Sequence, residues 1–379
     1  MRDVVYEPHD SSLIDRYRYG LAYRADWPNP IVIDIPQTSA DSLFILCYDD
    51  ETLQDSLIFH VSAANHTTEL YNLIPNRIYR YEITCGDDVL QQGKIHTFGQ
   101  LRQIKVCNTV YNVRDLGGWR TADNMQLRYG KLFRGTELNG TYVATTEGID
   151  MLRGLGIGAE LDLRAPYNEG HGVSAFGFSI ISSSSGVARY YYSSDSGQLP
   201  SHLKEYIWRN KWKREFQFIV GNLRLGRAVY EHCVHGKDRT GFLSFLLEGL
   251  LGVTYNDLVK DYELTFFSNQ TESTKDSIDK VFDYIETMYG ETLRDKFNTY
   301  FVNYLGVNQD DIDYFRSEML EAVKPRENDS TVRDIETNND GNNDRLFYDL
   351  NGRRVISPIS GRLYLIRGRN GYTYKIFYQ

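Results

Sequence analysis

A strand, a tight loop and a helix between residues 227 and 252 constrain this chain more than any other stretch. Residues 227–231 (Arg-Ala-Val-Tyr-Glu) have the composition of a short strand. Residues 242–251 are largely apolar and end at Gly252, which predicts a helix. The sequence between them is His-Cys-Val-His-Gly-Lys-Asp-Arg-Thr-Gly, with Cys233 and Arg239 at its two ends. The pattern therefore predicts a loop that brings both side chains to the N-terminus of one helix.

A loop that enters a helix N-terminus suits phosphate. Its backbone N–H groups converge on one point, and the helix dipole adds partial positive charge there. Arg239 is expected to clamp two phosphate oxygens, and Gly236 to let the backbone approach closely. Cys233 is expected at the floor of this cup as a thiolate, with Thr240 donating to it and Lys237 adding positive charge at the rim. A thiolate in that position is a nucleophile near neutral pH.

Four segments in order carry a resemblance to a known family. Residues 232–241 resemble the His-Cys-x5-Arg-[Ser/Thr] signature of the cysteine-dependent protein tyrosine phosphatases, in the Gly-Lys-Asp-Arg-Thr-Gly form of their bacterial family. Residues 112–118 match its N-x-RDLGG element, residues 129–135 its G-x-[IL]-[FY]-R element, and residues 155–164 its LGI and DLR unit. The resemblance covers about residues 108–325 and implies hydrolysis of phosphomonoesters without a metal or other cofactor.

The resemblance also implies roles for single residues. Cys233 would attack phosphorus, and Arg239 with the loop amides would stabilise the transition state. Asp238 is the first choice for the general acid, and Asp162 is the second. The phosphate-binding residues would be Val234, His235, Gly236, Lys237 and Thr240, and the supporting residues would be His232, Arg164 and Asp115.

Asp162 and Arg164 are also placed by an argument that does not depend on the resemblance. Residues 158–164 are predicted to form a strand, and ligands bind at the carboxyl ends of strands in open α/β sheets. The alternative is a buried structural ion pair near the site. No Trp-Pro-Asp acid loop is recognised in the sequence: residues 26–28 are Asp-Trp-Pro, which has these residue types in another order and lies outside the predicted catalytic domain.

The four cysteines also have possible roles other than catalysis. A buried structural role is the alternative for Cys233, but the ordered flanking motifs argue against it. Cys47, Cys85 and Cys107 have no Arg six positions later and are expected to be core or strand residues. A zinc site built on Cys233 and its neighbouring histidines lacks a second Cys/His pair, so no metal site is expected.

The predicted architecture is multidomain. Short β runs between residues 31 and 98 indicate an all-β sandwich, and residues 70–81 resemble a fibronectin type III element with Tyr79 at its aromatic corner. We predict a fibronectin III/Ig-like sandwich over residues 1–100, an α/β phosphatase domain over 101–325, a polar linker over 326–345 and a C-terminal β-hairpin module over 346–379. The sandwich is expected either to brace the catalytic domain or to bind a partner.

Within the α/β domain two further segments stand out. Residues 182–197 are rich in Ser, Gly and Tyr and are either a lid or a connector. The helix predicted over residues 201–225 carries an excess of Lys and Arg, which either attracts an anionic substrate or headgroup or forms a solvated face.

Charge and composition exclude some functions. The net charge of −9 argues against a dedicated nucleic-acid binder, and no apolar run is long enough to span a membrane. The first eight residues have no apolar signal-peptide region, whereas the C-terminal β pattern resembles modules of exported bacterial proteins and favours an extracytoplasmic location. The expected partner is a phosphorylated substrate: a phosphotyrosine protein first, with a phosphoinositide or inositol phosphate as the alternative. A protein that only binds phosphorylated ligands is the alternative from another class, and the sequence does not indicate an oligomeric state.

Overall fold

The computed structural model describes residues 26–50, 57–178, 181–182, 203–204, 206–268 and 276–323, together with four strands between residues 346 and 378. The chain divides into two compact units, Met1–Val323 and Lys324–Gln379. The predicted polar linker lies outside the described residues, as does the predicted lid apart from Ser182.

The N-terminal region of the first unit is built of strands. Strands β2 (Ser42–Asp49), β3 (Leu57–Ser62), β5 (Ile78–Cys85) and β6 (Asp88–His96) form an antiparallel sheet in the order β3-β2-β5-β6. β1 (Ile31–Asp34) and β4 (Thr67–Leu70) form a second antiparallel pair. The sequence predicts strands over residues 31–35, 42–48, 57–61, 78–83 and 94–98. β4 was therefore missed, because its sequence Thr-Thr-Glu-Leu is polar, and β6 was predicted only near its end.

Tyr79 anchors this region. Its side chain is buried, and its hydroxyl accepts a hydrogen bond from the Ile74 backbone N–H at 3.0 Å. A tyrosine that bonds to the backbone a few residues upstream is the contact of a tyrosine corner. The likeness to fibronectin type III stays a prediction.

A five-stranded sheet forms the centre of the catalytic region, in the order β11-β10-β12-β9-β7. The strands are β7 (Arg114–Asp115), β9 (Leu132–Gly135), β10 (Ile157–Asp162), β11 (Ile181–Ser182) and β12 (Ala228–His232). All pair in parallel except β7, which is antiparallel to β9. His232 pairs with Asp162 on one side and with Gly135 on the other, so β10, β12 and β9 end on one rung. The loops that follow these strands leave the sheet at the same edge, where α/β proteins bind ligands.

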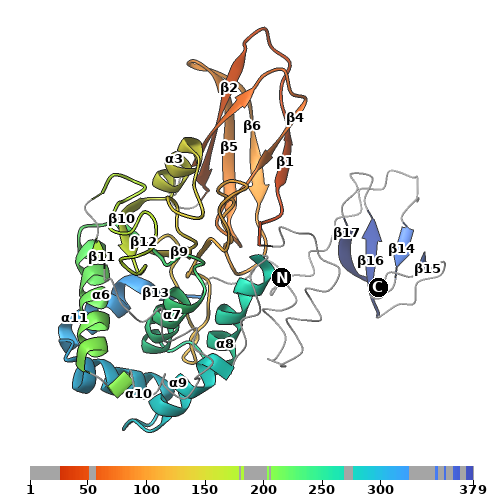
Figure 1. Ribbon diagram of the computed structural model, residues 1–379. Helices are drawn as coiled ribbons and strands as arrows, with labels where there is room; N and C mark the ends of the chain where they lie inside the picture. Colours follow the sequence, from red (N-terminus) through yellow and green to blue (C-terminus); the bar gives the residue numbers. More distant parts are fainter. Residues whose placement is uncertain are drawn as a thin grey trace. The chain divides into compact units, whose positions relative to one another are not determined.

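Helices cover both faces of this sheet (Figure 1). Helix α3 (Thr146–Gly154) shares a core with Tyr230. The sequence predicts an N-terminal cap at Thr145 or Thr146, and the Thr145 side chain accepts a hydrogen bond from the Gly148 N–H. The opposite core, which contains Val229, is formed by α6 (Tyr206–Arg224), α7 (Asp238–Leu251), α8 (Tyr255–Glu263), α9 (Asp276–Glu286), α10 (Leu293–Thr299), α11 (Gln309–Met319) and the short turns η1 (Leu264–Ser268) and η2 (Tyr300–Leu305). Tyr230 and Val229 point to opposite faces because side chains alternate along a strand.

Helix α7 is the central helix. All its residues after Asp238 are buried, which explains a sequence that is apolar nearly all round. Gly252 ends the helix with φ 94°, a left-handed conformation that glycine adopts without strain. Further along, the helical periodicity of residues 309–323 predicts a single helix, but α11 ends at Met319. Residues Leu320–Ala322 instead form β13, which pairs with β8 (Met125–Leu127).

The second unit contains a four-stranded antiparallel sheet in the order β15-β14-β16-β17. Its strands are Leu346–Tyr348, Arg354–Val355, Arg362–Arg367 and Thr373–Tyr378 for β14 to β17. In the part of the chain that the structure describes, no helix has the length and apolar character needed to cross a membrane.

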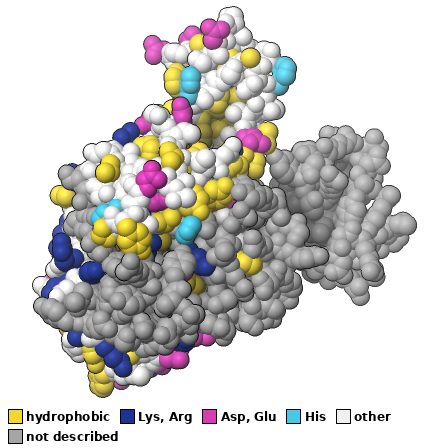
Figure 2. Space-filling view, viewed as in Figure 1, with side chains coloured by type: hydrophobic (Ala, Val, Ile, Leu, Met, Phe, Trp, Pro, Cys, Tyr) yellow, Lys and Arg dark blue, Asp and Glu magenta, His cyan; other side chains and the backbone are white. Residues whose placement is uncertain are grey.

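The helix predicted over residues 201–225 corresponds to α6, which begins at Tyr206 and carries Arg209, Lys211, Lys213, Arg214 and Arg224. Figure 2 shows Lys and Arg side chains along the edge of the molecule where α6 and α11 lie in Figure 1. Arg224 pairs with Asp311 at 2.8 Å and lies 4.7 Å over the Tyr314 ring. Part of the local charge excess is therefore balanced by α11, and a role in attracting an anion stays a prediction.

Candidate active site

Cys233 directly follows β12 and opens the loop that leads into α7, as the sequence predicts. Its side chain is only 3% exposed. Burial acts to raise the pKa of the thiol, but the charge of Arg239 and hydrogen bonds from Thr240 outweigh it, so the pKa lies below its usual value. The result is a buried cysteine that favours the thiolate.

Cys47 shows what burial does without such neighbours. It lies fully buried in β2, and burial raises the pKa of its thiol to about 12. The opposite shifts at Cys47 and Cys233 come from the neighbouring charges and donors, since both thiols are desolvated. Cys85 and Cys107 are half-buried, and all four cysteines are free.

The carbonyl groups of the loop are held from outside. The Gly236 carbonyl accepts from the Asn112 side-chain amide at 3.0 Å and from the Arg134 guanidinium at 2.9 Å. The Val234 carbonyl accepts from the Glu137 backbone N–H at 3.1 Å. Because the C=O and N–H of a trans peptide point in opposite directions, each held carbonyl turns the next amide toward the concave side of the loop. The geometry is that of an anion-binding nest.

Gly236 fits a place where no other residue does. Its φ is +62°, in the left-handed region. A Cβ there would lie against the Gly135 carbonyl, far inside van der Waals contact. The turn of the loop and its close packing on the end of β9 therefore both require glycine.

Arg239 and Lys237 are both more enclosed than expected. The Arg239 guanidinium donates to the Leu163 carbonyl at 2.9 Å and is 8% exposed. Lys237, expected at the rim of the cup, is only 9% exposed. Thr240 is fully buried, and both its hydroxyl and its backbone N–H lower the pKa of Cys233.

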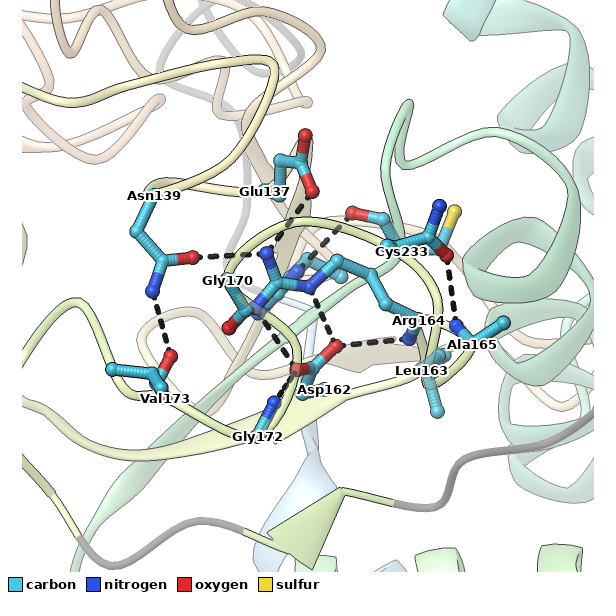
Figure 3. A network of polar contacts seen from close by, with 12 residues as sticks. Glu137, Asn139, Asp162, Leu163, Arg164, Ala165, Gly170, Gly172, Val173 and Cys233 are labelled. Atoms are coloured by element: carbon cyan, nitrogen blue, oxygen red, sulfur yellow. Dashed lines mark hydrogen bonds and ion pairs between the residues drawn. The ribbon is translucent and has the colours of Figure 1, made fainter.

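Asp162 and Arg164 lie at the carboxyl end of β10 and form a buried ion pair (Figure 3). The carboxylate accepts from Arg164 Nε and Nη2 at 2.9 Å each and from the backbone N–H groups of Arg164 and Gly172. Burial acts to raise the pKa of Asp162, but these hydrogen bonds and the charges of His232 and Arg164 lower it to about 2. The group is ionised and fully hydrogen-bonded.

The Arg164 guanidinium also reaches the loop after β9. It donates to Glu137 Oε2 at 3.0 Å and to Asn139 Oδ1 at 2.9 Å (Figure 3). Two carbonyls of the loop after β10 accept from it as well, at 2.7 Å from Gly170 and 2.8 Å from Glu169. Arg164 therefore ties together the loops that follow β9 and β10.

Asp238 and Asp115 have different surroundings. Asp238, the first residue of α7, is half-buried, and its carboxylate accepts a long 3.4 Å hydrogen bond from the Tyr262 hydroxyl. Asp115 is buried in β7, where it accepts from the backbone N–H groups of Gly117 and Gly130 and pairs with Arg102 at 3.3 Å. These contacts are with the segments around β7, so Asp115 supports the domain and does not line the phosphate loop.

His232 is buried beside Cys233. Its Nε2 lies 3.0 Å from Glu160 Oε1, and its Nδ1 lies 3.1 Å from the Cys233 carbonyl oxygen. Both neighbours can only accept, so both ring nitrogens carry hydrogen and the ring is an imidazolium. Burial acts to lower the pKa of His232, but the hydrogen bond and charge of Glu160 raise it. The expected support of the thiolate thus has a physical basis.

His235 lies at the edge of the loop. Its Nδ1 is 2.9 Å from the Tyr142 hydroxyl, and the Tyr142 ring also packs edge-on against Tyr111. Burial lowers the pKa of His235, which favours its neutral form. These rings flank the loop that holds Cys233.

A buried charged cluster supports the loop from behind. Asp261 on α8 pairs with Arg134 at 2.7 Å and with Arg114 at 2.8 Å, and the Trp119 ring N–H also donates to it. Arg134 in turn holds the Gly236 carbonyl. Since the three charged groups are buried and paired, they fix one another in place.

Several of these residues were given no role from the sequence. Asn112, Arg114 and Arg134 stand in the matched motifs, which was the available signal. Asp261, Glu160 and Glu137 carry no local pattern, because their partners come from distant parts of the chain.

The comparisons with known proteins identify the family of the chain. The sequence model of the tyrosine phosphatase family matches residues 106–321, which is more than half of the chain. The chain therefore belongs to the tyrosine phosphatase family, and the resemblance found from its motifs is confirmed.

A relative from Cupriavidus necator is 26% identical over 167 residues, and its name assigns it, provisionally, to the tyrosine-protein phosphatases. The match covers 41% of this chain and 60% of the relative, so the chain spans less than two thirds of that protein.

Proposed function

We propose that this protein is a metal-independent phosphomonoester hydrolase that works through a phosphocysteine, with phosphotyrosine proteins as its substrates. The observation that carries the proposal is Cys233, a buried thiol whose pKa is lowered at the floor of a loop with outward-held carbonyls. Such a loop offers amides to phosphate and a nucleophile to its phosphorus atom.

The reaction has two steps. The Cys233 thiolate attacks phosphorus, and the bond to the leaving oxygen breaks while a carboxylic acid protonates that oxygen. Water then attacks the phosphocysteine, a carboxylate takes its proton, and the P–S bond breaks to return the thiolate. In both steps Arg239 and the loop amides stabilise the equatorial phosphate oxygens.

The surroundings of the two candidate acids favour Asp238. Asp162 is ionised, with a pKa of about 2, and its oxygens are taken by Arg164 and by backbone amides. A carboxylate whose oxygens are engaged in this way is not available to a leaving group. Asp238 is half-exposed and lies in the loop itself, with one long hydrogen bond. We therefore assign the acid and base roles to Asp238.

Phosphate release in the presence of EDTA tests the mechanism. We expect wild type to release phosphate from a phosphotyrosine peptide, Cys233→Ser to lose this activity, and Cys107→Ser to keep it. Cys107 is a matched control, because its thiol also has a lowered pKa: hydrogen bonds from Thr109 and from backbone amides outweigh its burial. Equal release by Cys233→Ser and wild type would rule out the phosphocysteine.

The same assay compares substrates. A phosphoserine peptide, phosphoinositides and phytate are offered beside the phosphotyrosine peptide. Faster release from the lipids or from phytate would indicate that the substrate is inositol-based and not a phosphotyrosine protein. Phosphate binding without release from any of them, by a folded wild type, would leave a binding protein.

A further inference from the structure

Asn112 has a left-handed backbone conformation at the edge of the phosphate loop. Its φ is +56°, in a region that few residues other than glycine and asparagine adopt. Its side chain is buried and holds the loop: Nδ2 donates to the Gly236 carbonyl at 3.0 Å and to Thr265 Oγ1 at 3.1 Å, while Oδ1 accepts from Arg114 at 2.6 Å. Buried contacts with the surroundings fix this conformation and the direction of the side chain.

Asp26 provides one of these fixing contacts. Its Oδ2 accepts the backbone N–H of Asn112 at 2.9 Å, although the two residues are 86 positions apart. Both side chains are buried, at 4% and 3% exposure. Asp26 lies in the segment ahead of β1, outside the part of the chain that the family model matches.

We propose that Asp26 is a positioning residue for the phosphate loop. By accepting from the Asn112 N–H, it holds the left-handed backbone that aims the Asn112 carboxamide at Gly236. The held Gly236 carbonyl turns the Lys237 amide toward the phosphate cup. The N-terminal segment thus completes the phosphate site, which deepens the proposed function because the same cup is concerned.

A second contact shows that the N-terminal region meets the catalytic region independently of the loop. The Asn72 carbonyl accepts from Arg102 Nε at 2.9 Å and Nη2 at 2.6 Å. The Asn72 side chain bonds to the Lys105 backbone in both directions, at 2.8 and 2.9 Å. None of these contacts involves the phosphate loop, so Asn72 offers a matched control. Asn72→Gly removes the side-chain bonds and suits its φ of +69°.

The experiment uses the full chain and three readouts: amide hydrogen exchange of peptides that span residues 233–241, binding of inorganic phosphate by calorimetry, and turnover of para-nitrophenyl phosphate. In Asp26→Ala we expect faster loop exchange, and phosphate affinity and kcat each about tenfold lower, as for a lost charge-assisted hydrogen bond. Asn72→Gly is expected to change none of these readouts by more than about twofold. Asp26→Asn should recover most of the loss, because its amide oxygen still accepts.

A double variant separates positioning from general destabilisation. If Asp26 acts through Asn112, then Asp26→Ala adds nothing in the background of Asn112→Ala. If the losses of the two single variants multiply in the double variant, the proposal is overturned. It is also overturned if a folded Asp26→Ala keeps loop exchange and phosphate affinity within twofold of wild type. Should Asp26→Ala not fold, Asp26→Glu keeps the charge, displaces the acceptor and carries the same expectations. Wild type without turnover would end the proposed hydrolase, whereas the exchange readout would still decide the role of Asp26.

Discussion

Two Asp–Arg pairs flank Cys233, and they differ in what their side chains have left to offer. Asp162 and Arg164 are fully buried and bound to each other, to the Glu137 side chain and to the backbone of the loop after β10. Among the described residues, Asp238 accepts one long side-chain hydrogen bond from the Tyr262 hydroxyl, and the Arg239 guanidinium donates to the Leu163 carbonyl. Both pairs consist of one Asp and one Arg, and both lie at the same edge of the sheet. Asp162 ends strand β10, whereas Asp238 begins helix α7.

The difference teaches that residue type and place in the fold do not separate chemistry from support. A carboxylate and a guanidinium whose hydrogen-bonding groups are already satisfied hold loops together, whereas partly engaged ones remain available to a ligand. The two pairs touch through Leu163, whose carbonyl accepts from Arg239 and whose neighbours are Asp162 and Arg164. The supporting pair thereby sets where Arg239, the proposed phosphate-binding residue, lies.

The largest expected effect is on stability, from Arg164→Ala. The change leaves Asp162 and Glu137 buried without their cation, which costs about 3–5 kcal/mol in the free energy of unfolding. Urea titration followed by circular dichroism measures it. Arg128→Ala is the control, since the Arg128–Glu321 pair is partly exposed and 3.7 Å long and is expected to contribute less than about 1 kcal/mol. Equal midpoints for Arg164→Ala and wild type would contradict a supporting role.

Arg239→Ala should show the opposite pattern. Loss of the group that stabilises the equatorial oxygens is expected to lower kcat about 10³-fold, or about 4 kcal/mol, while the urea midpoint changes little. Steady-state turnover of an aryl phosphate measures kcat. If Arg239→Ala unfolds as readily as Arg164→Ala, the contrast between the pairs fails.

The two aspartates sharpen the comparison further. Asp238→Asn is expected to lower kcat about 10²-fold for substrates with poor leaving groups and much less for good ones, because only poor ones need a proton. Asp162→Asn should show no such dependence on the leaving group. If the leaving-group dependence of kcat is found in Asp162→Asn instead of Asp238→Asn, then Asp162 is the general acid.

At acid pH, the free energy of unfolding should depend on the ionisation of Asp162. Its folded-state pKa of about 2 lies below its ordinary value of 3.8, so its contribution is present above about pH 4 and disappears as the pH falls toward 2. The difference corresponds to about 2 kcal/mol at 1.36 kcal/mol per pKa unit. Unfolding free energies of Asp162→Asn should therefore vary less than those of wild type over this range. Parallel curves for the two proteins would contradict the prediction.

The smallest effect is expected from Glu160→Gln. Glu160 keeps His232 as an imidazolium, so its replacement should raise the pKa of the Cys233 thiol by about one unit. The rate of iodoacetamide alkylation as a function of pH measures this pKa. Ser174→Ala is the control: it removes the 2.5 Å hydrogen bond to the other Glu160 oxygen and leaves the His232 contact in place. An unchanged alkylation profile in Glu160→Gln would show that Glu160 does not influence the pKa of Cys233.

Much of the fold followed from local patterns. The capped helix at Thr146–Gly154, the strand before Cys233 and the apolar helix ended by Gly252 were all predictable, because caps, periodicity and glycine breaks act within a few residues. β4 and β13 were missed, since their polar or mixed sequences pair only when a distant strand is present. The site followed the same division. The motif assembled Cys233, Gly236 and Arg239, but it carried no sign of Asp26 or Asp261.

By itself, the sequence determined the family, the strand-loop-helix unit and the residues that it presents, because these depend on neighbours along the chain. Only the tertiary structure decided which Asp is already bound, which carbonyls are held and how the pKa of Cys233 falls in spite of burial. Those properties depend on electric charge and hydrogen-bond partners a few ångströms away. Folding brings these partners together from distant positions, as with Asn112 and the Gly236 carbonyl that it holds, which are 124 residues apart.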